Sequence, residues 1–100
     1  MGAITGTLNG STEFAGDYKL LSLDITPASA SDTVTLTAST HGISEIMHVV
    51  PRLTAGYDSA LANIFATWSG LVITLVTINA SGAAATDWTG AAGKLLVIGR

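Results

Sequence analysis

Two segments of the chain alternate apolar and polar residues. Within residues 18–26, large aliphatic side chains occupy every second position from Leu21 onward, and polar residues lie between them. Within residues 33–39, threonines alternate with apolar residues, which predicts that Val34, Leu36 and Ala38 face inward. A period of two places successive side chains on opposite faces of a strand. Both segments are therefore predicted to be β-strands with one buried face.

Further segments extend this pattern along the chain. Residues 3–8 are rich in threonine and interrupted by glycine, which is typical of an edge strand or an extended arm. Residues 43–50 are apolar on both faces, and Pro51 after them indicates an edge or a bulge because proline cannot donate to a sheet ladder. Residues 71–78 predict the central strand, and residues 94–98 close the domain.

The segment 55–68 fits two different periodicities. Its large side chains stand at helical spacing, and Asp58 precedes most of them as an N-cap candidate. Residues 63–68 nevertheless alternate, and Ser69-Gly70 before a long strand is typical of a two-residue hairpin loop. We expect a short helical turn near Asp58, followed by a strand that enters this hairpin. His41-Gly42 is expected to be a turn.

The length and the strand pattern together define the fold class. A chain of 100 residues is long enough for one domain with a modest core. Short β-branched segments separated by Gly, Pro, Asn and Asp indicate an all-β protein. We expect an antiparallel β-sandwich or small jelly roll of about six to eight short strands. Residues 17–100 would form this domain, and residues 1–16 an edge strand or an extended N-terminal arm.

Charged residues are unusually scarce. They make up 11% of the chain, against about 25% in ordinary globular proteins, and Thr, Ser, Ala and Gly take their place. Soluble monomers usually carry a mixed charged surface, so we expect copies of the chain or a larger assembly to cover much of this one. The four basic residues are scattered in a chain of net charge −3. Nucleic acid is therefore not an expected partner, because neutralising phosphates takes clustered cations.

A membrane partner is not expected either. The longest apolar stretch, around residues 71–78, is far shorter than the roughly 20 residues that span a bilayer. The N-terminal MGAITGTLNG has neither the basic nor the apolar region of a signal peptide. Gly6 stands where a myristoylation pattern requires Ser or Thr. We therefore expect neither a membrane span nor a lipid anchor.

Residues that could carry chemistry are few. The chain has no cysteine, which excludes a thiolate zinc site and a thiol nucleophile. His41 and His48, the only histidines, would lie on opposite faces of a shared strand; His41 is expected in a turn and His48 in a packed or interface position. A calcium site in the Asp-bearing loops is one alternative, because hard oxygen ligands are plentiful there. We expect no enzymatic activity, no cofactor and no bound metal.

The two tryptophans have two interpretations. They could stack on sugar rings, or they could pack in a core or a subunit contact. The chain contains only six aromatic residues in all, which favours the second interpretation. We expect a subunit interface that includes Trp88, Asp87, Trp68, Tyr57 and His48. Asp87 and Thr89 are also placed to hydrogen-bond the backbone of their own turn.

The C-terminal WSGLVITLVTINASGAAATDWTGAAGKLLVIG, residues 68–99, resembles small virion structural proteins of tailed bacteriophages, of the capsid decoration or cement type. The features that carry the resemblance are the Ser69-Gly70 hairpin, the strand after it, the small-residue loop, the DWTG sequence at 87–90 and the closing LLVIG. The stretch DTVTLTASTHGISEI, residues 32–46, has the same style.

This resemblance implies a non-enzymatic protein on the exterior of a virion capsid. Such a protein binds and stabilises the lattice of the major capsid protein as a homo-oligomer, commonly a trimer, and often through a terminal arm such as residues 1–16. The five interface residues would then contact other subunits or the capsid. Two alternatives remain open: a jelly-roll glycan-binding module that uses Trp88 and Trp68, and another head, neck or tail component of a phage.

Overall fold

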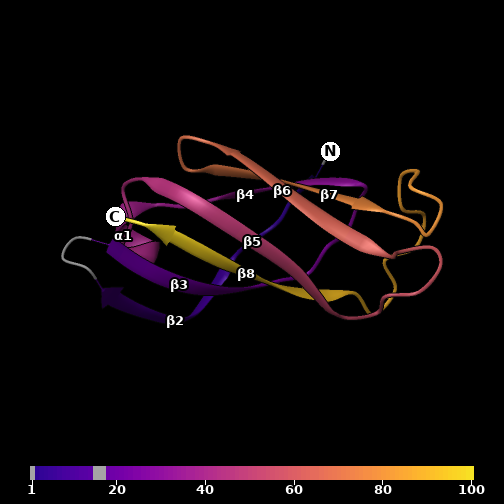
Figure 1. Ribbon diagram of the computed structural model, residues 1–100, viewed down its shortest axis with the longest axis horizontal. Coiled ribbons are helices and arrows are strands. Elements are labelled where there is room, and N and C mark those ends of the chain that lie inside the picture. The colour runs from indigo at the N-terminus through magenta and orange to yellow at the C-terminus, as the bar shows by residue number, and fades with distance from the viewer. Residues whose placement is uncertain (1, 15–17) are drawn as a thin grey trace.

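The alternating segments fold into two facing four-stranded sheets in the computed structural model, which describes residues 2–14 and 18–100 (Figure 1). The strand order is β1–β4–β7–β6 in one sheet and β2–β3–β8–β5 in the other. All pairings are antiparallel except that of β1 with β4. The predicted all-β antiparallel sandwich is confirmed. Its strands are β1 (Gly2–Ala3), β2 (Thr7–Phe14), β3 (Tyr18–Ile25), β4 (Ser31–Thr35), β5 (Ile46–Ala55), β6 (Asn63–Ser69), β7 (Val72–Ile78) and β8 (Ala92–Gly99).

The chain passes repeatedly from one sheet to the other. It stays in the same sheet only from β2 to β3 and from β6 to β7. The pairing of β4 with β7 is nested within that of β3 with β8, as in a jelly roll. The sandwich is elongated, 42 × 21 × 19 Å, with connecting loops gathered at its two ends (Figure 1). The N-terminal β1 and β2 are edge strands of different sheets, and residues 1 and 15–16 of the predicted arm lie outside the described part of the chain.

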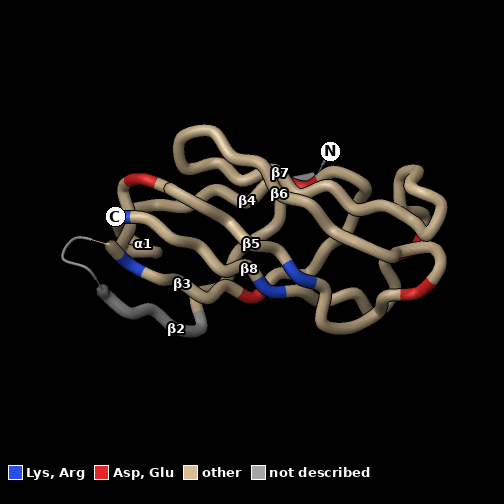
Figure 2. Tube along the Cα trace, in the orientation of Figure 1, with Lys and Arg blue, Asp and Glu red and all other residues tan. Residues whose placement is uncertain are grey.

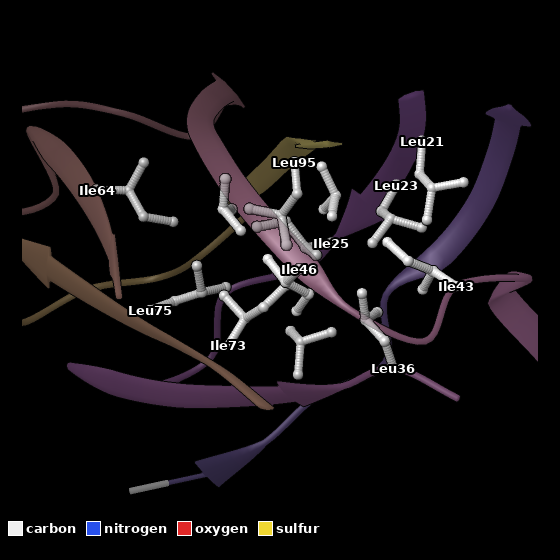
Figure 3. Packing of buried hydrophobic residues seen from close by; sticks show 13 residues of the cluster. Leu21, Leu23, Ile25, Leu36, Ile43, Ile46, Ile64, Ile73, Leu75 and Leu95 are labelled. Carbon is white, nitrogen blue, oxygen red and sulfur yellow. The ribbon is translucent and has the colours of Figure 1, made fainter. Parts of the chain in front are cut away.

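The core lies between the sheets and consists of aliphatic side chains from both (Figure 3). Burying one such side chain contributes ~1.5–3 kcal/mol. The inward direction predicted for Val34 and Leu36 is confirmed, whereas Ala38 is exposed. The buried residues of this cluster are Leu21, Leu23, Ile25, Val34, Leu36, Ile43, Ile46, Val49, Ile64, Ile73, Leu75, Leu95 and Val97.

A one-turn helix, α1 (Ala38–His41), replaces the last part of the strand predicted over residues 33–39. Thr37 caps its start, with Oγ1 accepting a hydrogen bond from Thr40 N at 3.2 Å. Gly42 ends it in the left-handed conformation, at φ 72°. The two caps outweigh the alternation of the sequence, and so Ala38 leaves the core.

The segment between β5 and β6 contains no helix, so the expected helical turn near Asp58 is wrong. The capping role of Asp58 is nevertheless present, because Oδ1 accepts hydrogen bonds from Ala60 N at 2.8 Å and Leu61 N at 3.1 Å. These bonds close a turn that brings Leu61 into a buried position, 0% exposed. The alternating residues 63–68 do form a strand, β6, as predicted.

The β6–β7 hairpin has the predicted two-residue loop, shifted by one position. Ser69 pairs with Val72, so the loop is Gly70-Leu71 and not Ser69-Gly70. Gly70 has a φ of 60°, which type I′ and II′ turns require at their first central residue. The left-handed position therefore belongs to the first loop residue, and Ser69 remains in the strand.

Two predictions about strand position are confirmed. β5, which contains Pro51, lies at the edge of its sheet, and its pairing with β8 is irregular between Ile46 and His48 and between Leu53 and Ala55. β7 is central, between β4 and β6. Proline at an edge leaves the ladder of the inner strands intact.

Candidate interaction surface

Trp88 is anchored within its own chain. Its Nε1 donates a hydrogen bond to Thr77 Oγ1 at 3.0 Å, and Thr77 Oγ1 donates to the carbonyl oxygen of Ser29 at 3.2 Å. The half-buried indole also packs against a small second core. Trp88 thereby holds the loop 79–91 against the sandwich. The buried residues of the second core are Leu61, Ala85 and Ala91.

Side-chain oxygens shape the loop that carries Trp88. Asn79 Oδ1 accepts hydrogen bonds from Ser81 N, Ser81 Oγ and Ala83 N at 2.9–3.1 Å. Asp87 Oδ1 accepts from Thr89 Oγ1 at 2.7 Å and from Thr89 N at 2.9 Å. These two bonds hold the pKa of Asp87 below its ordinary value, and the bond from the Thr89 hydroxyl has the larger effect. The prediction that Asp87 and Thr89 hydrogen-bond their own turn is confirmed.

Tyr57 lies in the neighbouring loop at the same end of the sandwich (Figure 1). Backbone hydrogen bonds join the two loops, from Ala80 N to Ser59 O at 2.9 Å and from Thr86 N to Ala60 O at 3.2 Å. The Tyr57 residue is 62% exposed. This end of the molecule therefore presents an exposed tyrosine and the Asp87 carboxylate, beside a tryptophan engaged within the chain.

Trp68 and His48 form a second, separate pair. Their rings meet edge to face, with centroids 5.8 Å apart and planes at 89°. Trp68 packs from β6 against the margin of the main core, and His48 is exposed on β5. This pair lies beside the end of β6 that leads into the hairpin loop, away from the loops that hold Trp88 and Tyr57 (Figure 1). The five predicted interface residues therefore fall in two places, and their role as an interface stays a prediction.

His41 is buried at the end of α1, and both ring nitrogens have partners. Nδ1 accepts a hydrogen bond from Thr37 N at 3.0 Å, which leaves Nε2 to donate to Gly6 O, also at 3.0 Å. His41 thus ties the helix to the segment between β1 and β2. Over residues 2–14 and 18–100, no three side chains of His, Cys, Asp or Glu gather as they would around a metal ion. The calcium alternative gains no support there.

The outer face of the β1–β4–β7–β6 sheet carries no charged side chain among the residues that the structure describes. The one charged residue in the described strands of this sheet, Asp32, points inward and is 1% exposed. Phe65, Val76 and Val72 are exposed on this face at 51%, 40% and 39%. We call it the neutral face. Its three cross-strand rows are Ser31–Val76–Phe65, Thr33–Thr74–Thr67 and Thr35–Val72–Ser69.

The basic residues lie on the strands of the opposite sheet or directly after β8, as the blue segments in Figure 2 show. Asp24, Lys94 and Arg52 form a row across β3, β8 and β5, and Lys94 Nζ lies 2.7 Å from Asp24 Oδ1. Exposed apolar residues such as Val50 and Leu96 share this face with the charges. The two outer faces of the sandwich therefore differ sharply in charge.

The sequence did not single out Phe65, Val72 and Val76 as surface residues. In residues 71–78, both sets of alternating positions contain aliphatic residues. A pattern of this kind predicts a strand without indicating which face is outward.

Comparison of the chain with protein-family models, with curated proteins and with solved structures found no match. Within the described residues, no helix has the length and hydropathy needed to cross a membrane.

Proposed function

We propose that the protein is a non-enzymatic structural component that acts by covering surface in an assembly. The observation that carries this proposal is the neutral face, where Phe65, Val72 and Val76 stand among threonines and serines with no charge among the described residues. Covering such a face requires no charge to be desolvated, and desolvated charges are the costly part of an interface. The low charge of the whole chain, 11% of residues, supports the same conclusion.

The assembly we propose is the capsid of a tailed bacteriophage, with the protein bound as a homo-oligomer to the major capsid protein on the outside of the virion. The resemblance of residues 68–99 to capsid decoration proteins supports this choice, and a trimer is the form that it implies. In this proposal, Tyr57 and Asp87 contact neighbouring proteins from the end loops, and Trp88 keeps those loops in place. Trp68 and His48 form the second predicted contact.

Glycan recognition has weaker support. The indole N–H of Trp88 is bonded to Thr77, and the ring packs on the second core. The other tryptophan, Trp68, packs against the main core. Neither ring is presented as a free stacking platform.

Light scattering during size-exclusion chromatography and co-sedimentation with capsid shells of the parent phage test the proposal. We expect an oligomer that sediments with the shells. Val72→Lys should weaken assembly or shell binding because it buries a charge, whereas the matched control Val50→Lys, on the opposite face, should leave both unchanged. Val72 and Val50 are similarly exposed, at 39% and 44%. A monomer that ignores the shells would refute the proposal.

A further inference from the structure

The four edges of the two sheets are protected to different degrees. Unpaired strand edges attract other strands, and proteins blunt them by shortness, bulges, proline or charge. β1 has two residues, and β2 has an irregularity in its pairing between Leu8 and Gly10. β5 has two irregularities and contains Pro51 and Arg52. Three edges therefore carry such devices.

The fourth edge, β6, carries none of them. Its sequence, NIFATWS, contains no charge, no proline and no glycine. It pairs with β7 over seven residues without a register shift. Its outward side chains, which include Phe65 and Thr67, belong to the neutral face. β6 is thus a regular and uncharged strand at the edge of a sheet.

The backbone groups at this edge can be assigned from the ladder. Leu36 N bonds to Leu71 O at 2.8 Å, so the odd-numbered residues of β7 direct their backbone groups toward β4 and the even-numbered ones toward β6. The even-numbered residues of β7 pair with the odd-numbered residues of β6. The backbone groups of Ile64, Ala66 and Trp68 therefore point away from β7. There the N–H of Ile64 has a local acceptor, Asn63 Oδ1, at 2.8 Å.

We propose that β6 pairs antiparallel with β6 of a second copy of the chain, about a two-fold axis at Ala66. This inference deepens the proposed function, because it names one self-contact of the homo-oligomer. In this register, Ala66 faces its own copy and Ile64 faces Trp68 of the other chain. These are the residues whose backbone groups point outward, so the inter-chain bonds form without disturbing the ladder to β7.

The chemistry of the strand favours a second copy as the occupant. The two-fold rotation brings an alanine against itself at the centre, where a large side chain would collide. On the outer surface it places Phe65 beside Thr67 of the other copy, a pair of an aromatic and a β-branched side chain on a continuous neutral face. No charges meet, although each chain carries a net charge of −3. Because an isologous contact makes a dimer, a trimer would have to use a different surface.

Ala66→Pro tests this pairing directly. Proline removes the N–H that points away from β7 and leaves the bonds of Phe65 and Thr67 to β7, so an edge strand can accept it. We expect the wild type to be a dimer in sedimentation-velocity experiments over a dilution series. Ala66→Pro should raise the dimer dissociation constant at least about tenfold, which is ~1.4 kcal/mol, with an unchanged far-ultraviolet circular dichroism spectrum.

A second variant and a second measurement cover the case in which Ala66→Pro does not fold. Thr67→Lys introduces a charge next to the two-fold axis and should weaken the dimer, whereas Thr74→Lys, one strand further in, should not. Amide exchange at Ala66 and Trp68 should slow as concentration rises. A wild type that remains monomeric, or dimers that survive both β6 variants, would overturn the inference. Binding of monomers to capsid shells would overturn the self-pairing alone, and a dimer that ignores shells would overturn only the capsid role.

Discussion

Replacing Trp88 by phenylalanine tests whether this residue stabilises its own chain. The change keeps a ring in the second core but removes the donor to Thr77 Oγ1, a bond of 3.0 Å to a residue that is 1% exposed. A neutral hydrogen bond contributes ~0.5–1.5 kcal/mol net, and the smaller ring loses further packing. We therefore expect Trp88→Phe to lower the free energy of unfolding by about 1–2 kcal/mol. Trp88→Ala should cost about 3 kcal/mol, the low end for aromatic truncation, because the indole is only half-buried.

A double-mutant cycle isolates the hydrogen bond. Thr77→Val keeps the shape of the buried side chain but removes the acceptor for Trp88 Nε1 and the donor to Ser29 O. It should cost about 2 kcal/mol. Combined with Trp88→Phe, it should show a coupling energy of about 1 kcal/mol, because both changes remove the same bond.

Urea unfolding provides the measurement, with an unchanged m-value as the check on two-state behaviour. Tyr57→Ala is the control, since that residue is 62% exposed and its loss should change stability by no more than about 0.5 kcal/mol. The reasoning would be refuted by a Trp88→Ala protein as stable as the wild type but unable to assemble. The indole would then act between chains.

Three further changes test other parts of the fold. Gly56→Ala should lower the free energy of unfolding in urea by at least about 3 kcal/mol, because Gly56 has φ 73° and a Cβ would lie 2.6 Å from backbone atoms of Ala91. The control Gly82→Ala, at φ 87° in open space, should cost only ~1–2 kcal/mol. Equal costs would refute the close approach of Gly56 to Ala91. Asp32→Ala should lower the free energy of unfolding by about 3 kcal/mol, because Ser29 Oγ and two backbone N–H groups lose the buried carboxylate as acceptor. A thermal midpoint near that of the wild type would contradict this expectation. By NMR titration the pKa of Asp87 should lie below 3.8. The small stabilisation of the fold by the ionised carboxylate is therefore present above about pH 4 and is lost as pH falls through the folded pKa. Thr89→Val should raise this pKa, and an unchanged value would exclude the Thr89 hydroxyl as the cause of the lowered pKa.

Period-two alternation predicted β3, β4 and β6, because successive side chains of a strand in a sandwich point to opposite faces of the sheet. It failed where local hydrogen bonds replaced the ladder. Thr37 and Gly42 form caps that turn the expected strand end into α1, and Asp58 closes a turn where a helix was expected. In both places the polar residue was visible in the sequence, but its backbone partner depended on a chain path that periodicity does not define.

The candidate surface was less predictable for a different reason. Phe65 and Val76 are cross-strand partners on the neutral face, and that neighbourhood exists only once β6 and β7 are in register. Trp88 is likewise held by a hydrogen bond to Thr77, which in turn bonds to Ser29. Thr77 and Ser29 are 48 residues apart in the chain. Long-range partners of this kind depend on strand order, which the sequence pattern did not specify.

The contrast between the two outer faces bears on how an assembly of this chain could stay in solution. The four basic residues of the sequence lie on β3, β5 and β8 or directly after β8. Their sheet can remain in water while the neutral face and the β6 edge are covered, because none of the four basic residues then has to leave solvent. The reverse arrangement would bury the Asp24–Lys94–Arg52 row and expose the edge most prone to pair with other strands. The distribution of charge therefore gives the sandwich a covered side and a solvated side, and β6 belongs to the covered one.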